Sequence, residues 1–233
     1  MTSISESDIS KGQAIYTPFM LKLYDVWVLD ISNTWIWRCS KFVLQEYFNQ
    51  HTTVNHLDIG VGTGYYIKKY PWTSNAKLSL MDLNPNCLEV AKNMSQNITP
   101  HVYLHDVFKS NKTLFGQFHS VSMNYLLHCL PGSFKTKSIA IANAVSMLMP
   151  GGVLFGATIL ANTNLHTKLS KHLCAFYNKK GIFSNEEDTL EALKIALEEH
   201  LTQVEIKVVG CVALFKGNRK PAVLNKAVNK HST

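Results

Sequence analysis

Apolar runs of strand length alternate with helical segments along most of this chain of 233 residues. Short apolar runs bounded by turn residues are typical of buried strands, and longer amphipathic segments are typical of helices. The expected strands span 54–57, 77–81, 101–105, 118–124 and 153–160, and the expected helices span 40–50, 65–70, 84–96 and 136–149. This alternation predicts a parallel sheet covered by helices on both faces.

The C-terminal part of the chain departs from this alternation. Residues 204–215 have the pattern of two strands that meet at Gly210, and the second is apolar enough to be an antiparallel strand inside the sheet. Before them, Ser184 and Glu187 have the spacing of a capping box, which predicts a helix from there to residue 200. The expected fold class is therefore α/β, with a doubly wound, mostly parallel seven-stranded sheet.

Two further segments qualify the domain organisation. Aromatic residues crowd 16–38, which suggests helices packed over the domain, and a polar, aromatic-bearing stretch with His166 and His172 interrupts the alternation after the fifth strand. The expected organisation is a disordered leader at 1–11, a single domain at 12–218 with a helical N-terminal cap at 12–50 and a candidate lid at 161–183, and a basic disordered tail at 219–233.

Composition and charge give expectations about nucleic-acid partners, membranes, disulfides and metals. The net charge of +7 falls to +2 when five basic residues near the C-terminus are set aside, so the body is nearly neutral and a nucleic-acid partner is not expected. No signal peptide and no apolar run of about 20 residues is present, which predicts a cytoplasmic protein without a membrane partner. The five cysteines are scattered without a C-x-x-C pair, so neither disulfides nor a metal site are expected.

The most informative motif is the strand end that runs into alternating glycines, with Asp58 followed by Gly60, Gly62 and Gly64. Glycines at a strand-to-helix turn allow a nucleotide-like cofactor to approach the backbone. A dinucleotide fingerprint requires G-x-G-x-x-G, whereas here the sixth place is Tyr65. A carboxylate before the first glycine would repel a pyrophosphate but suits an ammonium or sulfonium group, which favours S-adenosylmethionine over NAD.

Other polar residues follow the remaining expected strands. Asp82, Asp106 and Asn124 end or follow the second, third and fourth strands, whose carboxyl ends meet at one edge of the sheet. His128 comes next, and because imidazole accepts a proton near neutral pH it is a candidate general base. A packed, hydrogen-bonded structural histidine is the alternative at that position.

Residues 57–64, Asp82, Asp106, the run 124–132, Pro150-Gly151-Gly152 and the terminal strand pair together resemble class I S-adenosylmethionine-dependent methyltransferases, over roughly 15–217. Within that superfamily the chain looks most similar to small methyltransferases of microbial small-molecule metabolism. The resemblance implies a Rossmann-like methyltransferase fold, S-adenosylmethionine as cofactor and S-adenosylhomocysteine as product.

The resemblance also implies roles for individual residues. Asp58 would organise the methionine ammonium group beside the three glycines, and Asp82 would accept hydrogen bonds from the ribose hydroxyls. Leu83 and Val107 would lie against the adenine, Asp106 would meet its amino group, and Asn124 would face the methionine moiety. Tyr16 completes the expected cofactor-binding set, since aromatic rings attract sulfonium groups.

The resulting hypothesis is an enzyme that methylates a small, partly apolar metabolite at an oxygen, nitrogen or carbon atom. Residues 124–126 depart from the Asn/Asp-Pro-Pro-aromatic motif of exocyclic-amine methyltransferases, which disfavours base or glutamine methylation. An RNA or protein methyltransferase and a cofactor-binding protein without methylating activity are the alternatives. The sequence leaves the acceptor atom, the pathway and the oligomeric state open.

Overall fold

A single seven-stranded sheet organises the computed structural model, which describes residues 33–95, 98–161 and 163–221. The strand order is β3-β2-β1-β4-β5-β7-β6, and β7 is antiparallel to both of its neighbours while the other pairs are parallel. The strands are β1 (Asn55–Ile59), β2 (Lys77–Asp82), β3 (His101–Leu104), β4 (Phe118–Asn124), β5 (Leu148–Ile159), β6 (Leu201–Val209) and β7 (Val212–Arg219). The predicted α/β fold class and the inserted antiparallel strand are confirmed.

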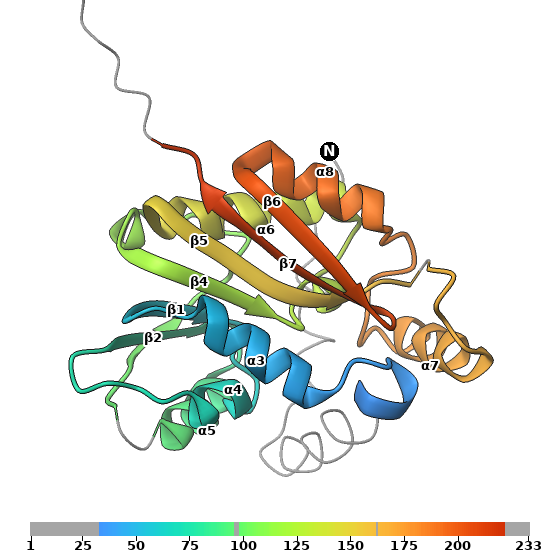
Figure 1. The fold of residues 1–233 in the computed structure, drawn as a ribbon, viewed down its shortest axis with the longest axis horizontal. Coiled ribbons are helices and arrows are strands. Elements are labelled where there is room, and N and C mark those ends of the chain that lie inside the picture. The colour runs from blue at the N-terminus through green and yellow to red at the C-terminus, as the bar shows by residue number, and fades with distance from the viewer. Residues whose placement is uncertain (1–32, 96–97, 162, 222–233) are drawn as a thin grey trace, which may run out of the picture.

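Helices cover both faces of the sheet (Figure 1). On one face, α3, α4 and α5 pack through side chains such as Phe48 and Ile67; on the other, α6 and α8 pack through side chains such as Ile141 and Leu197. The helices are α3 (Lys41–His51), α4 (Tyr65–Lys69), α5 (Pro85–Met94), α6 (Phe134–Met147), α7 (Lys168–Lys179) and α8 (Leu190–His200), with 3-10 turns η2 (Lys112–Leu114) and η3 (Leu127–Cys129). None of the helices in the described ranges is long and apolar enough to cross a membrane.

The predicted start of α5 illustrates how the local sequence sets the elements. The Asn84 side chain accepts a hydrogen bond from the Asn86 backbone N–H, and Pro85 occupies the first helical position. A side-chain acceptor at the N-cap satisfies an otherwise unpaired amide, and proline has no amide to satisfy there. Both signals act within four residues, which is why they are visible in the sequence.

The boundary between α6 and β5 was predicted wrongly. The helix ends at Met147 and the strand begins at Leu148, so the Pro-Gly-Gly segment expected to separate them lies inside β5. Leu148 pairs with Phe118 of β4, and the register shifts before the next pair, Ser120 with Val153. The pairing of Leu148 therefore starts the strand before the turn signal, and the Pro-Gly-Gly segment forms the irregularity in the register.

The capping box at Ser184 and Glu187 was also wrong. Helix α8 begins at Leu190, and the hydroxyl of Thr189 accepts the capping bond from the Ala192 N–H at 3.1 Å. The Ser184 hydroxyl instead accepts from the Gly132 N–H at 3.1 Å, so a long-range contact uses the side chain that the prediction gave to the helix.

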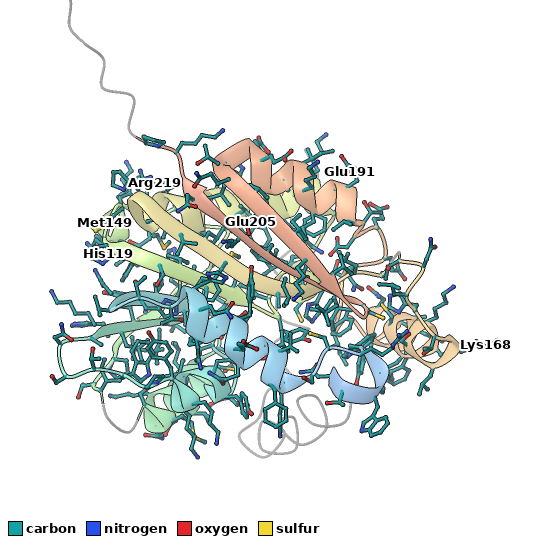
Figure 2. The ribbon with its side chains drawn as sticks, in the orientation of Figure 1. His119, Met149, Lys168, Glu191, Glu205 and Arg219 are labelled. Atoms are coloured by element: carbon teal, nitrogen blue, oxygen red, sulfur yellow. The ribbon has the colours of Figure 1, made fainter. Side chains whose placement is uncertain are left out.

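Strand β7 and its contacts extend into the segment predicted as the basic tail. Strand β7 extends to Arg219, whose guanidinium donates to the carbonyl of Ser146 at 3.1 Å and to that of Leu148 near the start of β5 (Figure 2). Lys220 donates to the Glu199 carbonyl at 2.9 Å, and Lys216 of β7 forms an ion pair with Glu205 of β6 at 3.2 Å. Three of the five basic residues set aside in the charge argument therefore make contacts within the domain.

The N-terminal cap and the candidate lid can be followed only in part. Residues 1–32, which include Tyr16, the leader and most of the cap, lie outside the described residues. Trp37 is buried, with its ring centroid 6.0 Å from that of Phe183 and 6.3 Å from that of His166. The candidate lid contains α7 and packs against the described part of the cap, and its movement as a lid stays a prediction.

Candidate active site

The glycine turn between β1 and α4 combines close packing with one open position. All three glycines have positive φ, at 75°, 52° and 72°. A Cβ on Gly60 would lie 2.8 Å from Leu126 Cδ1, and one on Gly64 would lie 2.8 Å from Ala91 Cα of α5, whereas a Cβ on Gly62 would meet no atom within 4 Å. Gly60 and Gly64 therefore allow the turn to pack, and Gly62 leaves open space beside the backbone.

Asp82, at the end of β2, holds this turn in place. Its Oδ1 accepts the Asn84 N–H at 2.8 Å, and the backbone amides of Val61, Gly62 and Leu83 also bond to the carboxyl. Burial raises the pKa of Asp82, and the four amide donors oppose that rise. The carboxyl thus lies directly against the glycine turn, and its contact with the ribose hydroxyls stays a prediction.

Asp58, at the end of β1, is 4% exposed and accepts a hydrogen bond from the Ser122 hydroxyl of β4. Its pKa is raised to about 7, mainly by burial and also by the nearby Asp82 charge, while the Ser122 hydrogen bond opposes the rise. None of the ion pairs among the described residues involves Asp58. A buried carboxyl without a cationic partner favours binding of a cationic group.

The other predicted cofactor residues lie near the same sheet edge. They differ in how far their polar groups are already hydrogen-bonded within the described part of the protein. Asp106 is 9% exposed, and its Oδ1 accepts the Phe108 N–H at 2.9 Å. Val107 packs in the hydrophobic core, and its carbonyl accepts from the Asn143 side chain, so its contact with adenine stays a prediction. The Asn124 side-chain nitrogen at the end of β4 is buried without a hydrogen-bond partner among the described residues, which leaves a donor for a ligand.

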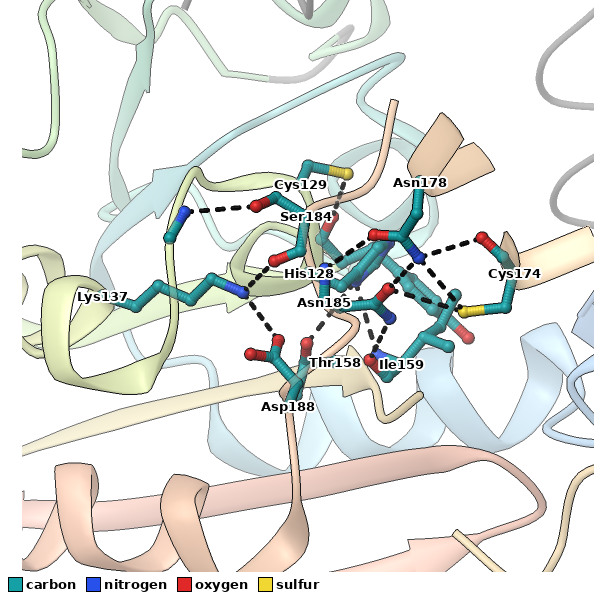
Figure 3. Close-up of polar contacts among 12 residues, drawn as sticks. His128, Cys129, Lys137, Thr158, Ile159, Cys174, Asn178, Ser184, Asn185 and Asp188 are labelled. Atoms are coloured by element: carbon teal, nitrogen blue, oxygen red, sulfur yellow. Dashed lines mark hydrogen bonds and ion pairs between the residues drawn. The ribbon is translucent and has the colours of Figure 1, made fainter. Parts of the chain in front are cut away.

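His128 lies in η3 and is almost fully buried (Figure 3). Its Nδ1 accepts the Ile159 N–H at 3.4 Å, and its ring contacts Phe183 edge-on with centroids 4.5 Å apart. Burial lowers the pKa of His128 to about 3, and the charge of Lys137 lowers it further. These features are those of a structural histidine, so the general-base role stays a prediction that the geometry does not support.

Beside His128 lies a buried ion pair that the sequence did not reveal. Lys137 Nζ of α6 is 2.6 Å from Asp188 Oδ2, both side chains have no exposed surface, and Nζ also donates to the Ser184 carbonyl at 2.7 Å (Figure 3). Burial lowers the pKa of Lys137 and raises that of Asp188 to about 6, and each partner opposes the shift of the other. Lys137 looks like an ordinary charged residue of an amphipathic helix, and no local pattern marks it as buried.

A second polar group missed by sequence reasoning lies beneath Asp58. His56, Ser120 and Ser122 are fully buried, and register places His56 opposite Ser120 and Asp58 opposite Ser122. The His56 ring packs against the aromatic side chains of Phe48, Trp72 and Phe155. A signal was present in the sequence, because polar residues occupy every second position of two buried strands, which places them on one face.

Comparisons with known proteins agree with this geometry. The family described as a methyltransferase domain matches residues 57–156. The chain is 44% identical over 195 residues to the protein YbcY of Escherichia coli (strain K12), covering 82% of this chain and 100% of that protein. It is 40% identical over 211 residues to the physcion biosynthesis cluster O-methyltransferase of Aspergillus chevalieri, covering 88% of this chain and 94% of the relative.

The chain belongs to the methyltransferase family. Its fold is similar to that of the N-methyltransferase NodS from Bradyrhizobium japonicum WM9 in complex with S-adenosyl-L-homocysteine, with a TM-score of 0.60, 17% identity, and coverage of 92% of this chain and 99% of that chain. S-adenosylmethionine is the cofactor of this methyltransferase, and the predicted enzyme class is confirmed.

The residues at the sheet edge fit this cofactor. Within the described residues, open space beside Gly62, an amide donor on Asn124 without a partner and a buried carboxyl on Asp58 outside any ion pair complement a ligand that carries hydroxyl, carboxylate and ammonium groups. Roles for the individual residues toward the ligand remain predictions.

Proposed function

We propose that this methyltransferase methylates a hydroxyl oxygen of a small, partly apolar metabolite in the cytoplasm. The observation that supports the proposal is the aromatic character of the residues that follow the two predicted cofactor-binding segments. Tyr66 follows the glycine turn and Tyr125 follows Asn124, and both belong to the half-buried side chains that pack against the apolar cluster around Trp37 and Phe183. Aromatic side chains close in sequence to a charged cofactor subsite suit an acceptor with an apolar ring system.

The cofactor site supplies the electrostatics of the reaction. When bound, S-adenosylmethionine supplies a methyl group that its sulfonium already activates. Asp58 would hold the ammonium group, Asp82 the ribose hydroxyls, and Asn124 the methionine moiety. The protein's remaining tasks are to align the acceptor oxygen in line with the methyl group and to exclude water.

The acceptor hydroxyl must lose its proton during the transfer. His128 is poorly suited to take it, because its Nδ1 already accepts a backbone hydrogen bond and its pKa is low. An acidic hydroxyl, such as that of a phenol or an enol, ionises without a strong base. The relative from Aspergillus chevalieri is named as an O-methyltransferase, which supports oxygen as the acceptor atom.

The alternatives with macromolecular acceptors receive less support. Lys216, Arg219 and Lys220 make contacts inside the domain, so these cations are held by the fold and are not part of a separate basic tail that could dock an RNA.

The experiment is a transfer assay with purified protein and S-adenosylmethionine carrying a deuterated methyl group. A bicyclic phenol and the amine of the same ring skeleton are offered separately, and mass spectrometry locates the label. We expect labelled methyl ether and S-adenosylhomocysteine with the phenol. Label in added RNA or protein, label on the amine alone, or cofactor binding without any transfer would contradict the proposal.

A further inference from the structure

A chain of buried hydrogen bonds runs from Asp58 to the opposite end of β1. The Ser122 hydroxyl bonds to Asp58 Oδ1 and lies 3.1 Å from His56 Nε2. On the other side of the ring, His56 Nδ1 lies 2.8 Å from the Ser120 hydroxyl, which accepts the Thr53 N–H at 3.0 Å. The chain therefore passes from a carboxyl at the cofactor edge, through one imidazole, to a backbone amide.

When Asp58 is ionised, each donor in this chain of hydrogen bonds can point toward Asp58. The Thr53 N–H can only donate, so the Ser120 hydroxyl accepts it and can give its own hydrogen to His56 Nδ1. Burial lowers the pKa of His56 to about 3, so the ring is neutral and carries one hydrogen. That hydrogen is then on Nε2, which donates to Ser122, and Ser122 donates to the Asp58 carboxylate.

A protonated Asp58 whose hydrogen lies on Oδ1 reverses the direction of the chain. The Asp58 carboxyl then donates a hydrogen bond to the Ser122 hydroxyl, which in turn donates to His56 Nε2. The ring therefore carries its hydrogen on Nδ1. Nδ1 donates to the Ser120 hydroxyl, whose hydrogen can pass to Thr53 Oγ1 at 2.9 Å. Each protonation state of Asp58 thus matches one tautomer of His56.

The surroundings allow both states near neutral pH. Burial raises the pKa of Asp58 to about 7, and Asp82 is the charged neighbour that raises it further. The side chains whose rings pack against His56, from α3, β5 and the segment after α4, are Phe48, Phe155 and Trp72, none of which titrates. Among the described residues, the rings that pack against His56 therefore carry no ionisable group, and the hydrogen-bonded path through Ser122 links the ring to Asp58.

We propose that His56, Ser120 and Ser122 are positioning residues that couple cofactor binding to a proton on Asp58. When the ligand binds, its cationic end expels that proton and selects the Nε2–H tautomer of His56. This inference rests on the cofactor role that the proposed function gives to Asp58. The O–H bond of the Asp58 carboxyl breaks, and the proton leaves to solvent, either directly or by the stepwise shift of hydrogens along the chain toward Thr53.

The first experiment is calorimetric titration of the full chain with S-adenosylhomocysteine, in buffers of different ionisation enthalpy. At about pH 6 we expect release of about one proton per ligand bound, with affinity rising up to about tenfold per pH unit below the pKa of Asp58. Ser122→Ala removes the donor to Asp58 and should move this pH dependence upward, while Ser122→Thr keeps a hydroxyl and should restore it. Ser79→Ala, at a buried serine of β2 outside the chain, is the matched control and should leave the profile unchanged.

The second experiment needs no variant, because nitrogen-15 NMR of wild-type protein reports the tautomer of His56 directly. We expect the Nδ1–H form in the free protein at low pH and the Nε2–H form at high pH or with S-adenosylhomocysteine. A single tautomer under all conditions, or wild-type affinity that does not change with pH, would overturn the proposal. Failure of the proposed function is distinct: the ligand would then not bind at any pH, while the free protein would still report its tautomer.

Discussion

The protein contains two buried polar networks, each with a histidine whose pKa burial lowers to about 3, and they end differently. Beside His128, the charge of Lys137 meets that of Asp188 at 2.6 Å. Beneath the glycine turn, the network of His56 ends on Asp58, which joins no ion pair within the described residues. We call the first network closed because its buried charge meets a counter-charge, and the second open because it ends on a carboxyl outside the described ion pairs. The comparison teaches that the closed network serves the fold, whereas the open network is ready for a cationic ligand.

The largest expected effect comes from removing the cation of the closed network. Lys137→Met leaves Asp188 buried without its cation, and we expect a loss of about 3 to 5 kcal/mol in the free energy of unfolding, measured by urea denaturation at about pH 8. Below about pH 6 the loss should shrink, because an Asp188 that has lost its cation has a still higher pKa and is then neutral.

The control for this change is Lys194→Met on α8. Lys194 forms an ion pair with Glu198 at 4.0 Å, with both side chains 52% exposed, and solvent screens such pairs strongly. A similar loss in both variants would mean that the buried pair has no special role in the fold.

The next effect concerns the acid next to the open network. Asp82→Ala should weaken S-adenosylhomocysteine binding by on the order of 2 to 4 kcal/mol, because two charge-assisted hydrogen bonds are lost. Calorimetric titration measures the change, and Glu89→Ala, on the exposed face of α5, is the matched control. Unchanged affinity in Asp82→Ala would show that another residue binds the ribose.

Replacing the ionisable carboxyl of the open network by a neutral group should stabilise the protein and weaken cofactor binding. The pKa of Asp58 in the fold, about 7, lies above its ordinary value of 3.8, so ionisation costs stability as the pH rises between these values. Asp58→Asn should therefore raise the free energy of unfolding by on the order of 2 to 4 kcal/mol at about pH 8 and by little at about pH 4.

The measurement is urea denaturation of both proteins at the two pH values, together with calorimetric titration of S-adenosylhomocysteine. We expect weaker ligand binding in Asp58→Asn. A variant that is less stable than wild type at high pH would contradict the raised pKa of Asp58, and a variant that binds as well as wild type would remove Asp58 from the role of ammonium ligand.

The smallest expected effect is on catalysis by His128. His128→Gln can keep a polar contact with the Ile159 amide, and we expect turnover per folded molecule to stay within about threefold of wild type, since a general base contributes about a hundredfold or more. Steady-state kinetics on protein checked by circular dichroism measures this. A hundredfold loss of turnover with intact cofactor binding would establish the base role.

Local signals in the sequence predicted the strands and several helix ends. Asn84-Pro85 marks the start of α5, and the apolar runs mark β1 to β4, because capping and burial patterns act within a few residues. The Pro-Gly-Gly segment of β5 and the serine at 184 were misread, because pairing with β4 and contact with Gly132 come from distant parts of the chain.

The sequence alone determined the fold class, the glycine turn and the two acids at its edge, because chain order and alternation place strand ends at one edge of a parallel sheet. The tertiary structure alone decided which charges are paired. Lys137 meets Asp188 from 51 positions away, and Ser122 reaches Asp58 across 64 positions. Desolvation and partnership of a charge depend on such distant neighbours, so the pKa of Asp58 and the structural character of His128 could not be read from local sequence.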